Sequence, residues 1–334
     1  MGDIHKAGTD DGWHAVIEKG GKFEPEKDRY HLYIGLFCPF AHRVNLVRHL
    51  KGLTSILPIS TVLPYPKPWQ FPTDDTSYPN ATVDALFHST HLSAVYFQAD
   101  PAYTGRYSVP LIWDIKLNTA VSNESAEILR WLPNAFNGLL EPEKAGLDFY
   151  PEKHKGTIDV LTPFIQSYIN AGVYKAGFAK TQDAYNEAIP PLFGALNFVE
   201  QLVARNGGPY VLGKELTELD IRLYATIVRF DVVYVQHFKC DLGSIRGSYP
   251  MLNNWLKGLY WGVKGFREST DWKHIKENYT KSHADINPLA ITPLGPYPHI
   301  EEGYEKEWTK VKPGSIEHPQ VLEWQKKFEQ EIKL

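Results

Sequence analysis

The sequence predicts a protein of two domains, an α/β domain followed by an all-α domain. Between residues 30 and 135, short β-favouring stretches alternate with helical patterns. From residue 157 to residue 283 the apolar residues recur with the longer period of helices, without strand alternation. With 334 residues, the chain is long enough for each domain to bury a core of its own.

The first β-favouring stretch, residues 30–36, runs into an amphipathic helix at a Cys-Pro pair. Cys38 takes the N-cap position of this helix, and Pro39 takes the first helical position, where the missing N–H of proline costs nothing. The elements expected next are a strand over residues 55–62, a proline-rich insertion without regular structure over 63–80, and a helix over 82–99.

A hairpin closes the α/β domain. Residues 107–114 read as a strand with Pro110 inside it, which indicates an edge strand, a bulge or a cis bond, and residues 119–122 read as its partner. A helix follows through Leu132, with Ser122 or Asn123 as its N-cap. This order of strands and helices is typical of a thioredoxin-like domain, and we place it at 30–135.

The remaining segments follow from composition. Residues 1–29 are polar and Gly-rich and read as an N-terminal extension, and residues 136–156 read as a linker. The all-α domain spans 157–283, where Thr217 and Asp220 form a capping-box signature with a structural role. Residues 284–334 hold many prolines and mixed charges, so we expect an extended C-terminal segment.

Cys38 is the candidate nucleophile. The positive end of a helix dipole stabilises a thiolate, which lowers a cysteine pKa from about 8.5 into the range of roughly 3.5 to 7.5. The alternative is that Cys38 is one of the many buried, inert cysteines. Position 41 is Ala, so the motif has one thiol, and a mixed disulfide on Cys38 needs an outside thiol to resolve it. Cys240 lies in an aromatic helix end and reads as structural.

Composition and charge exclude several classes of function. The formal net charge is -4 and no basic stripe is present, which argues against nucleic-acid binding. Two cysteines far apart in the chain indicate a reducing compartment, and we expect a cytoplasmic protein. No apolar run approaches the ~20 residues of a membrane span, so no membrane partner is expected.

Six strings in the same order resemble the Xi class of cysteine-type glutathione transferases, the glutathionyl-hydroquinone reductases, within the omega-like superfamily. They are Cys38-Pro39-Phe40-Ala41-His42-Arg43, Val109-Pro110, Ser122-Asn123-Glu124-Ser125, the run 172–179, the run 228–231 and Ile286-Asn287-Pro288. The resemblance covers residues 12 to 304 and implies the glutathione transferase fold. One position departs from the family, because Phe40 stands where a Trp is usual.

The resemblance assigns residues to glutathione. It implies that Val109 and cis-Pro110 present a backbone edge to the cysteinyl amide, as extended peptides are often recognised. Glu124 would hold the ammonium group of the γ-glutamyl end and Ser125 its carboxylate, although both could serve only to cap a helix. Trp69 would lie beside glutathione, and its alternative role is packing within the insertion.

Other residues complete the expected site. Phe40 would pack beside the thiol and glutathione, while Arg106 or Lys67 could meet the glycyl carboxylate. A further set, implied by the resemblance to line the pocket for an aromatic substrate, consists of Tyr174, Tyr234 and Tyr279. A phenol can donate to a quinol oxygen while its ring packs on the substrate, although any one of nineteen tyrosines could instead be core or surface.

The resemblance implies that the protein is an enzyme that reduces glutathionyl-hydroquinones with glutathione, through a mixed disulfide on Cys38. Two alternatives are an omega-like thioltransferase or dehydroascorbate reductase, and a non-catalytic binder of aromatic ligands. We expect glutathione as co-substrate, glutathionylated aromatic compounds as substrates, no metal, and a homodimer.

Overall fold

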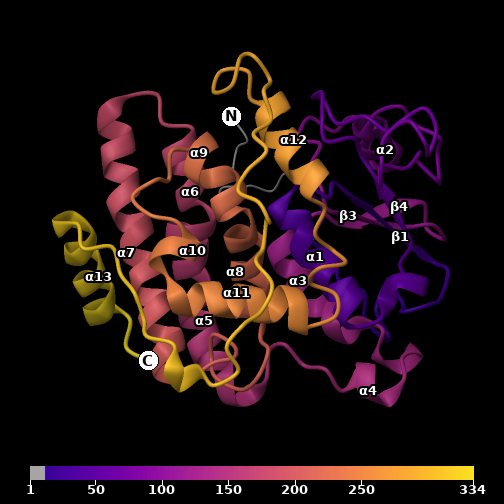
Figure 1. Ribbon diagram of the computed structural model, residues 1–334. Coiled ribbons are helices and arrows are strands. Elements are labelled where there is room, and N and C mark those ends of the chain that lie inside the picture. The colour runs from indigo at the N-terminus through magenta and orange to yellow at the C-terminus, as the bar shows by residue number, and fades with distance from the viewer. Residues whose placement is uncertain (1–11) are drawn as a thin grey trace. The chain divides into compact units, whose positions relative to one another are not determined.

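The computed structural model describes residues 12–334, and this part of the chain forms two compact units (Figure 1). The sheet unit contains the described residues 12–148 together with 264–292, and the helical unit contains 149–263 together with 293–334. Residues 264–292, which the sequence analysis divides between the helical domain and the C-terminal segment, thus cluster with the sheet. The first eleven residues of the expected N-terminal extension lie outside the described part.

The sheet has four strands in the order β2-β1-β3-β4. The strands are β1 (Tyr30–Ile34), β2 (Ile59–Thr61), β3 (Leu111–Asp114) and β4 (Thr119–Ser122). β1 is parallel to β2 and antiparallel to β3, and β3 is antiparallel to β4. Every residue of β1 and β3 is buried, as expected for central strands covered on both faces. The thioredoxin-like expectation is confirmed.

Helices surround this sheet within the same unit. They are α1 (Pro39–Leu50), α2 (Leu92–Ala99), α3 (Ser125–Ala135), the short α4 (Pro142–Ala145) and α12 (Trp272–Ser282), with 3-10 turns at Leu53–Ser55 and Asn137–Leu139. The apolar stripe predicted for α1 is buried at Val44, Val47 and Leu50, and α1 packs against α3.

Three expected elements are shorter than predicted. The strand expected over residues 55–62 spans only β2, and the strand expected over 107–114 begins at Leu111. The helix expected over 82–99 begins only at Leu92. The insertion over 63–80 lacks helices and strands, as predicted, apart from an isolated bridge between Gln70 and His91.

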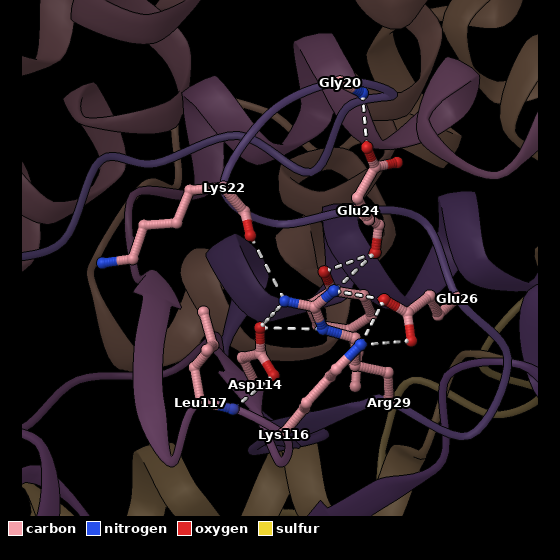
Figure 2. A network of polar contacts seen from close by, with 9 residues as sticks. Gly20, Lys22, Glu24, Glu26, Arg29, Asp114, Lys116 and Leu117 are labelled. Carbon is pink, nitrogen blue, oxygen red and sulfur yellow. Dashed lines mark hydrogen bonds and ion pairs between the residues drawn. The ribbon is translucent and has the colours of Figure 1, made fainter.

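The segment before β1 is hydrogen-bonded to β3 and β4 of the sheet. The Ala15 N–H donates to the Val121 carbonyl, which places this segment beside β4. The Arg29 guanidinium donates to the buried Asp114 carboxylate at the end of β3, with Nε–O and Nη2–O distances of 2.9 and 2.5 Å. Arg29 also donates to the Lys22 and Glu24 carbonyls, so one side chain ties the segment to the strand (Figure 2).

The helical unit confirms the all-α expectation for the second domain. Its helices are α5 (Lys155–Phe164), α6 (Gly172–Gly177), α7 (Gln182–Asn206), α8 (Glu218–Arg229), α9 (Val235–His237), α10 (Ile245–Ser248), α11 (Pro250–Gly262) and α13 (Pro319–Glu331). Two π-helical segments, η4 (Ile165–Asn170) and η5 (Phe230–Tyr234), and 3-10 turns at Glu152–His154 and Trp308–Lys310 complete it. Across the described residues, no helix is both long enough and apolar enough to span a bilayer.

The capping box is confirmed, and the C-terminal segment needs a correction. The Asp220 carboxylate accepts from the Thr217 N–H at 2.9 Å, and it also accepts from the Trp255 indole. The segment expected to be wholly extended ends instead in α13, which lies alongside α7 (Figure 1). Val321 and Phe328 bury the apolar face of this helix.

Candidate active site

Cys38 occupies the position that the sequence predicts. β1 ends at Ile34, a tight turn brings the Cys38 N–H to the Gly35 carbonyl at 2.9 Å, and α1 begins at Pro39. Cys38 has extended backbone angles (φ -76°, ψ 123°) at the N-cap, and its side chain makes no capping hydrogen bond. The half-buried thiol therefore lies at the positive end of α1, where an anion is stabilised.

The sheet register brings Val109 to this thiol. Tyr33 pairs with Leu111, so the chain leaving β1 and the chain entering β3 lie at the same end of the sheet. As a result, the Cys38 Sγ lies 3.6 Å from the Val109 carbonyl oxygen, to which the thiol can donate. The Val109–Pro110 peptide bond is cis, one of the alternatives that the sequence left open.

Glu124 and Ser125 form the start of α3. Glu124 is the N-cap, and its Oε1 accepts from the Ala126 N–H at 2.8 Å, so the expected cap at Ser122 or Asn123 is wrong. Ser125 is the first helical residue and is buried. Glu124 thus carries the capping role that was its alternative.

Trp69 is linked to the segment that carries Cys38 through Phe37. The rings of Phe37 and Trp69 have centroids 4.6 Å apart, and Phe37 directly precedes Cys38. The Trp69 carbonyl accepts from the Leu92 N–H, which fixes the insertion to the start of α2. The Lys67 ammonium lies 5.3 Å from the Trp69 ring centroid. Sequence reasoning missed Phe37, whose position between the turn and Cys38 was its only signal.

Phe40 is half-buried on the first turn of α1, near the thiol in sequence. The guanidinium carbon of Arg43 lies 4.9 Å from its ring centroid. A cation over an aromatic face is attracted to it, so the phenyl ring at this position is held by a cation–π contact.

The helical unit brings together two of the three predicted substrate tyrosines. Tyr174 on α6 and Tyr234 at the end of η5 have ring centroids 6.1 Å apart. Tyr279 lies on α12 in the sheet unit, where its buried ring contacts His283. Tyr279 thus belongs to a different compact unit of the chain from Tyr174 and Tyr234.

Two phenylalanines extend the tyrosine pair into an aromatic cluster that the sequence did not reveal. Phe238 is stacked on Tyr234 with centroids 5.4 Å apart and contacts Tyr174, and Phe178 is stacked on Tyr174. Gly177 makes this packing feasible, because a Cβ there would lie 2.2 Å from the Phe238 ring. Glycine inside a short helix beside two aromatic residues was the signal that could have found the cluster.

Cys240 differs from Cys38 in its burial. Its side chain is fully buried, and burial raises the pKa of its thiol well above the usual range. A buried, protonated thiol is a poor nucleophile, so its assignment as a structural residue is confirmed.

Comparison with known proteins places this architecture in one family. The sequence model for the glutathione S-transferase N-terminal domain matches residues 37–135, and that for the C-terminal domain matches residues 182–258. Both domain types are thus present in the order that the fold shows. The protein is a glutathione transferase by fold and sequence.

Individual relatives indicate which class of glutathione transferase the chain belongs to. The chain is 51% identical to "Glutathione S-transferase omega-like 2" of Schizosaccharomyces pombe, over 84% of this chain and 89% of that one. It is 44% identical to "Glutathionyl-hydroquinone reductase YqjG" of Escherichia coli, over 90% and 88%. The crystal structure of glutathione-S-transferase Xi from Phanerochaete chrysosporium superposes with a TM-score of 0.85 at 43% identity, covering 90% and 99%. The chain belongs to the Xi class of the glutathione transferase family.

Proposed function

We propose that the protein uses glutathione to remove the glutathionyl group from glutathionyl-hydroquinones. The observation that carries the proposal is the half-buried Cys38 thiol at the N-cap of α1, 3.6 Å from the Val109 carbonyl. A relative 44% identical over most of both chains is named a glutathionyl-hydroquinone reductase, and a structure of that relative is described as glutathione bound.

The reaction proceeds in two steps that share one covalent intermediate. The Cys38 thiolate attacks the substrate sulfur, an S–S bond forms, and the bond from sulfur to the aromatic carbon breaks. The electron pair of that bond stays with the carbon, which takes up a proton and becomes a hydroquinone C–H. A second glutathione thiolate then attacks the mixed disulfide, releasing oxidised glutathione and the Cys38 thiolate.

The same proposal assigns the binding residues. Val109 and Pro110 would offer the backbone edge to the cysteinyl amide, while Glu124 and Ser125 would hold the γ-glutamyl end at the start of α3. Trp69 and Phe40 would pack beside glutathione. The aromatic substrate would meet Tyr174, Tyr234 and Tyr279. Homodimer formation and a cytoplasmic location are also part of the proposal, and sedimentation analysis tests the first of these.

The decisive experiment compares hydroquinone release by the wild type, Cys38→Ser and Cys240→Ala. Cys38→Ser should lose at least ~100-fold in rate, because a hydroxyl at this position is a far weaker nucleophile than a thiolate. Cys240→Ala removes a thiol that is buried and should retain activity. Treating the wild type with substrate alone should leave one glutathionyl group on Cys38, detectable by mass. Full activity of Cys38→Ser would refute the mechanism.

A thioltransferase activity is the second candidate, because the 51% identical relative is named omega-like. Rates measured on two kinds of substrate test it. An omega-like thioltransferase would act faster on a small mixed disulfide than on a glutathionyl-hydroquinone. The ratio of the two rates therefore separates the two activities, and both need Cys38. A non-catalytic binder would instead bind aromatic ligands equally well with and without the Cys38 thiol.

A further inference from the structure

The buried tyrosine of α2 links the two halves of the proposed glutathione site. Tyr96 is fully buried, and α2 packs beside β4 (Figure 1). Its hydroxyl donates to the Ser108 carbonyl at 2.7 Å and accepts from the Ser108 N–H at 3.1 Å. The side-chain amide of Asn123 donates to the same hydroxyl at 3.3 Å. One phenol oxygen thus joins the two chain segments that flank the β3–β4 hairpin.

The two segments are those that carry the proposed contacts to glutathione. Ser108 immediately precedes Val109, whose carbonyl faces the Cys38 thiol. Asn123 immediately precedes Glu124, the N-cap of α3. A shift of Ser108 would therefore move the backbone edge, and a shift of Asn123 would move the start of α3. The pairing of β3 with β4 already connects these two parts of the site, and the Tyr96 hydroxyl adds a direct link between them.

Asn123 is also hydrogen-bonded to Trp13, in the segment before β1. The Trp13 N–H donates to the Asn123 side-chain oxygen at 3.0 Å, and the Asn123 N–H donates to the Trp13 carbonyl at 3.1 Å. The Trp13 ring contacts Tyr96 edge-on, with centroids 5.5 Å apart, and stacks on Tyr103. The segment before β1 therefore orients the amide that donates to Tyr96.

We propose that Tyr96 is a positioning residue for glutathione, setting the spacing between the Val109–Pro110 edge and the start of α3. The inference rests on the proposed function, because it assumes that both segments bind the tripeptide. Glutathione joins its γ-glutamyl end to its cysteinyl amide through a short flexible chain, so a site that holds both ends binds best when its two halves are kept at a separation that this chain spans. Tyr96 acts through Ser108 and Asn123, without a contact to the reacting sulfur.

The test is Tyr96→Phe, which removes the hydroxyl and keeps the ring, with Tyr30→Phe as the matched control. Tyr30 is also buried, and its hydroxyl donates to the Glu24 carbonyl at 2.7 Å, at a place remote in the chain from both halves. We expect Tyr96→Phe to weaken binding of glutathione sulfonate, an unreactive analogue, by about 5- to 30-fold, as the loss of one or two kcal/mol implies. Tyr30→Phe should change stability and leave this affinity unaltered.

A second readout separates positioning from general damage. The rate at which iodoacetamide alkylates Cys38 should be the same in Tyr96→Phe as in the wild type, because this small reagent needs no tripeptide site. If Tyr96→Phe does not fold, Asn123→Ala removes the amide donor to Tyr96, together with the acceptor of the Trp13 N–H, and leaves the contact between Tyr96 and Ser108. This variant should also weaken binding of glutathione sulfonate.

The outcomes distinguish this inference from the proposed function. Unchanged affinity for glutathione sulfonate in a folded Tyr96→Phe overturns the positioning role, whatever the wild type does to hydroquinone conjugates. An equal loss of affinity in Tyr30→Phe also overturns it. A wild type that binds the analogue but releases no hydroquinone refutes the proposed function and leaves the role of Tyr96 in binding intact.

Discussion

The buried ion pair between Arg29 and Asp114 gives the sharpest prediction for stability. Asp114 is 0% exposed and accepts from Arg29 through two guanidinium nitrogens, while its other oxygen accepts from the Leu117 N–H at 3.0 Å (Figure 2). The contact to Asp114 raises the pKa of the Arg29 guanidinium above its usual range, so the side chain stays charged. Asp114→Ala would leave that charge beside β3 without its buried counter-ion, with only the half-exposed Glu26 still paired to it.

The expected loss is about 3–5 kcal/mol in the free energy of unfolding, the typical cost of removing one partner of a buried pair. Glu26 also contacts Arg29 and is half-exposed, so it compensates in part and favours the lower end of that range. Lys116→Ala is the matched control, because the ion pair of Lys116 with Glu26 is exposed and its loss should leave the free energy of unfolding nearly unchanged.

Urea denaturation measures the loss, and amide hydrogen exchange in β1 and β3 locates it in the sheet unit. The double variant Arg29→Met with Asp114→Leu should recover part of the stability, because replacing both charges removes the desolvation cost together with the attraction. A loss below about 1 kcal/mol for Asp114→Ala would refute the reasoning, since it would mean that Arg29 reaches water once its partner is gone.

Two further predictions concern the aromatic cluster and a buried histidine. Gly177→Ala should lower the free energy of unfolding by about 1–3 kcal/mol and weaken binding of the aromatic substrate, because its Cβ would overlap the Phe238 ring. The control is Gly172→Ala, whose Cβ would meet Leu192 at an ordinary 3.4 Å and should change neither quantity. Thermal unfolding measures the stability, and KM measures the effect on the substrate. Burial lowers the pKa of His31 to about 4, so the unfolded chain, with a histidine pKa of about 6.5, binds the proton first as the pH falls. The stability due to the neutral ring is therefore present above about pH 6.5 and lost towards pH 4. Between these two pH values, the free energy of unfolding measured with urea should fall less for His31→Gln than for the wild type.

The position of Cys38 at a helix N-cap could be predicted because its determinants are local. A β-favouring stretch, a Cys-Pro pair and an amphipathic helix are adjacent in sequence, and each fixes the backbone of the next. The N-cap of α3 could not be predicted in the same way. Ser122 is paired in β4, and the Asn123 side chain is taken by Trp13 and Tyr96, so the cap passes to Glu124. Contacts from distant segments decided between equally good local candidates.

The two misassigned helices have different causes. The helix expected from residue 82 fails because Asp84 is buried and accepts from the Tyr33 hydroxyl and from the Leu86 and Ser89 N–H groups, a turn that competes with helix formation. A tertiary contact with β1 thus overrides the local pattern. For α13 the signal was present, since Pro319 opens the helix and Val321, Trp324 and Phe328 recur at helical spacing.

The substrate side of the proposed site is the part that sequence periodicity describes least well. Tyr234 ends the π-helical segment η5, and Tyr174 follows η4 after Ala171 and within α6. A π-helical turn holds one more residue per hydrogen-bonded ring than an α-helical turn, so each segment rotates the residues after it away from the face that a regular period assigns. The contact of Tyr174 with Tyr234 and Phe238 therefore depends on two local departures from α-helical geometry. The position of the Cys38 thiol at the start of α1 depends on none, which is why a motif suffices to predict that position while the aromatic cluster needs the structure.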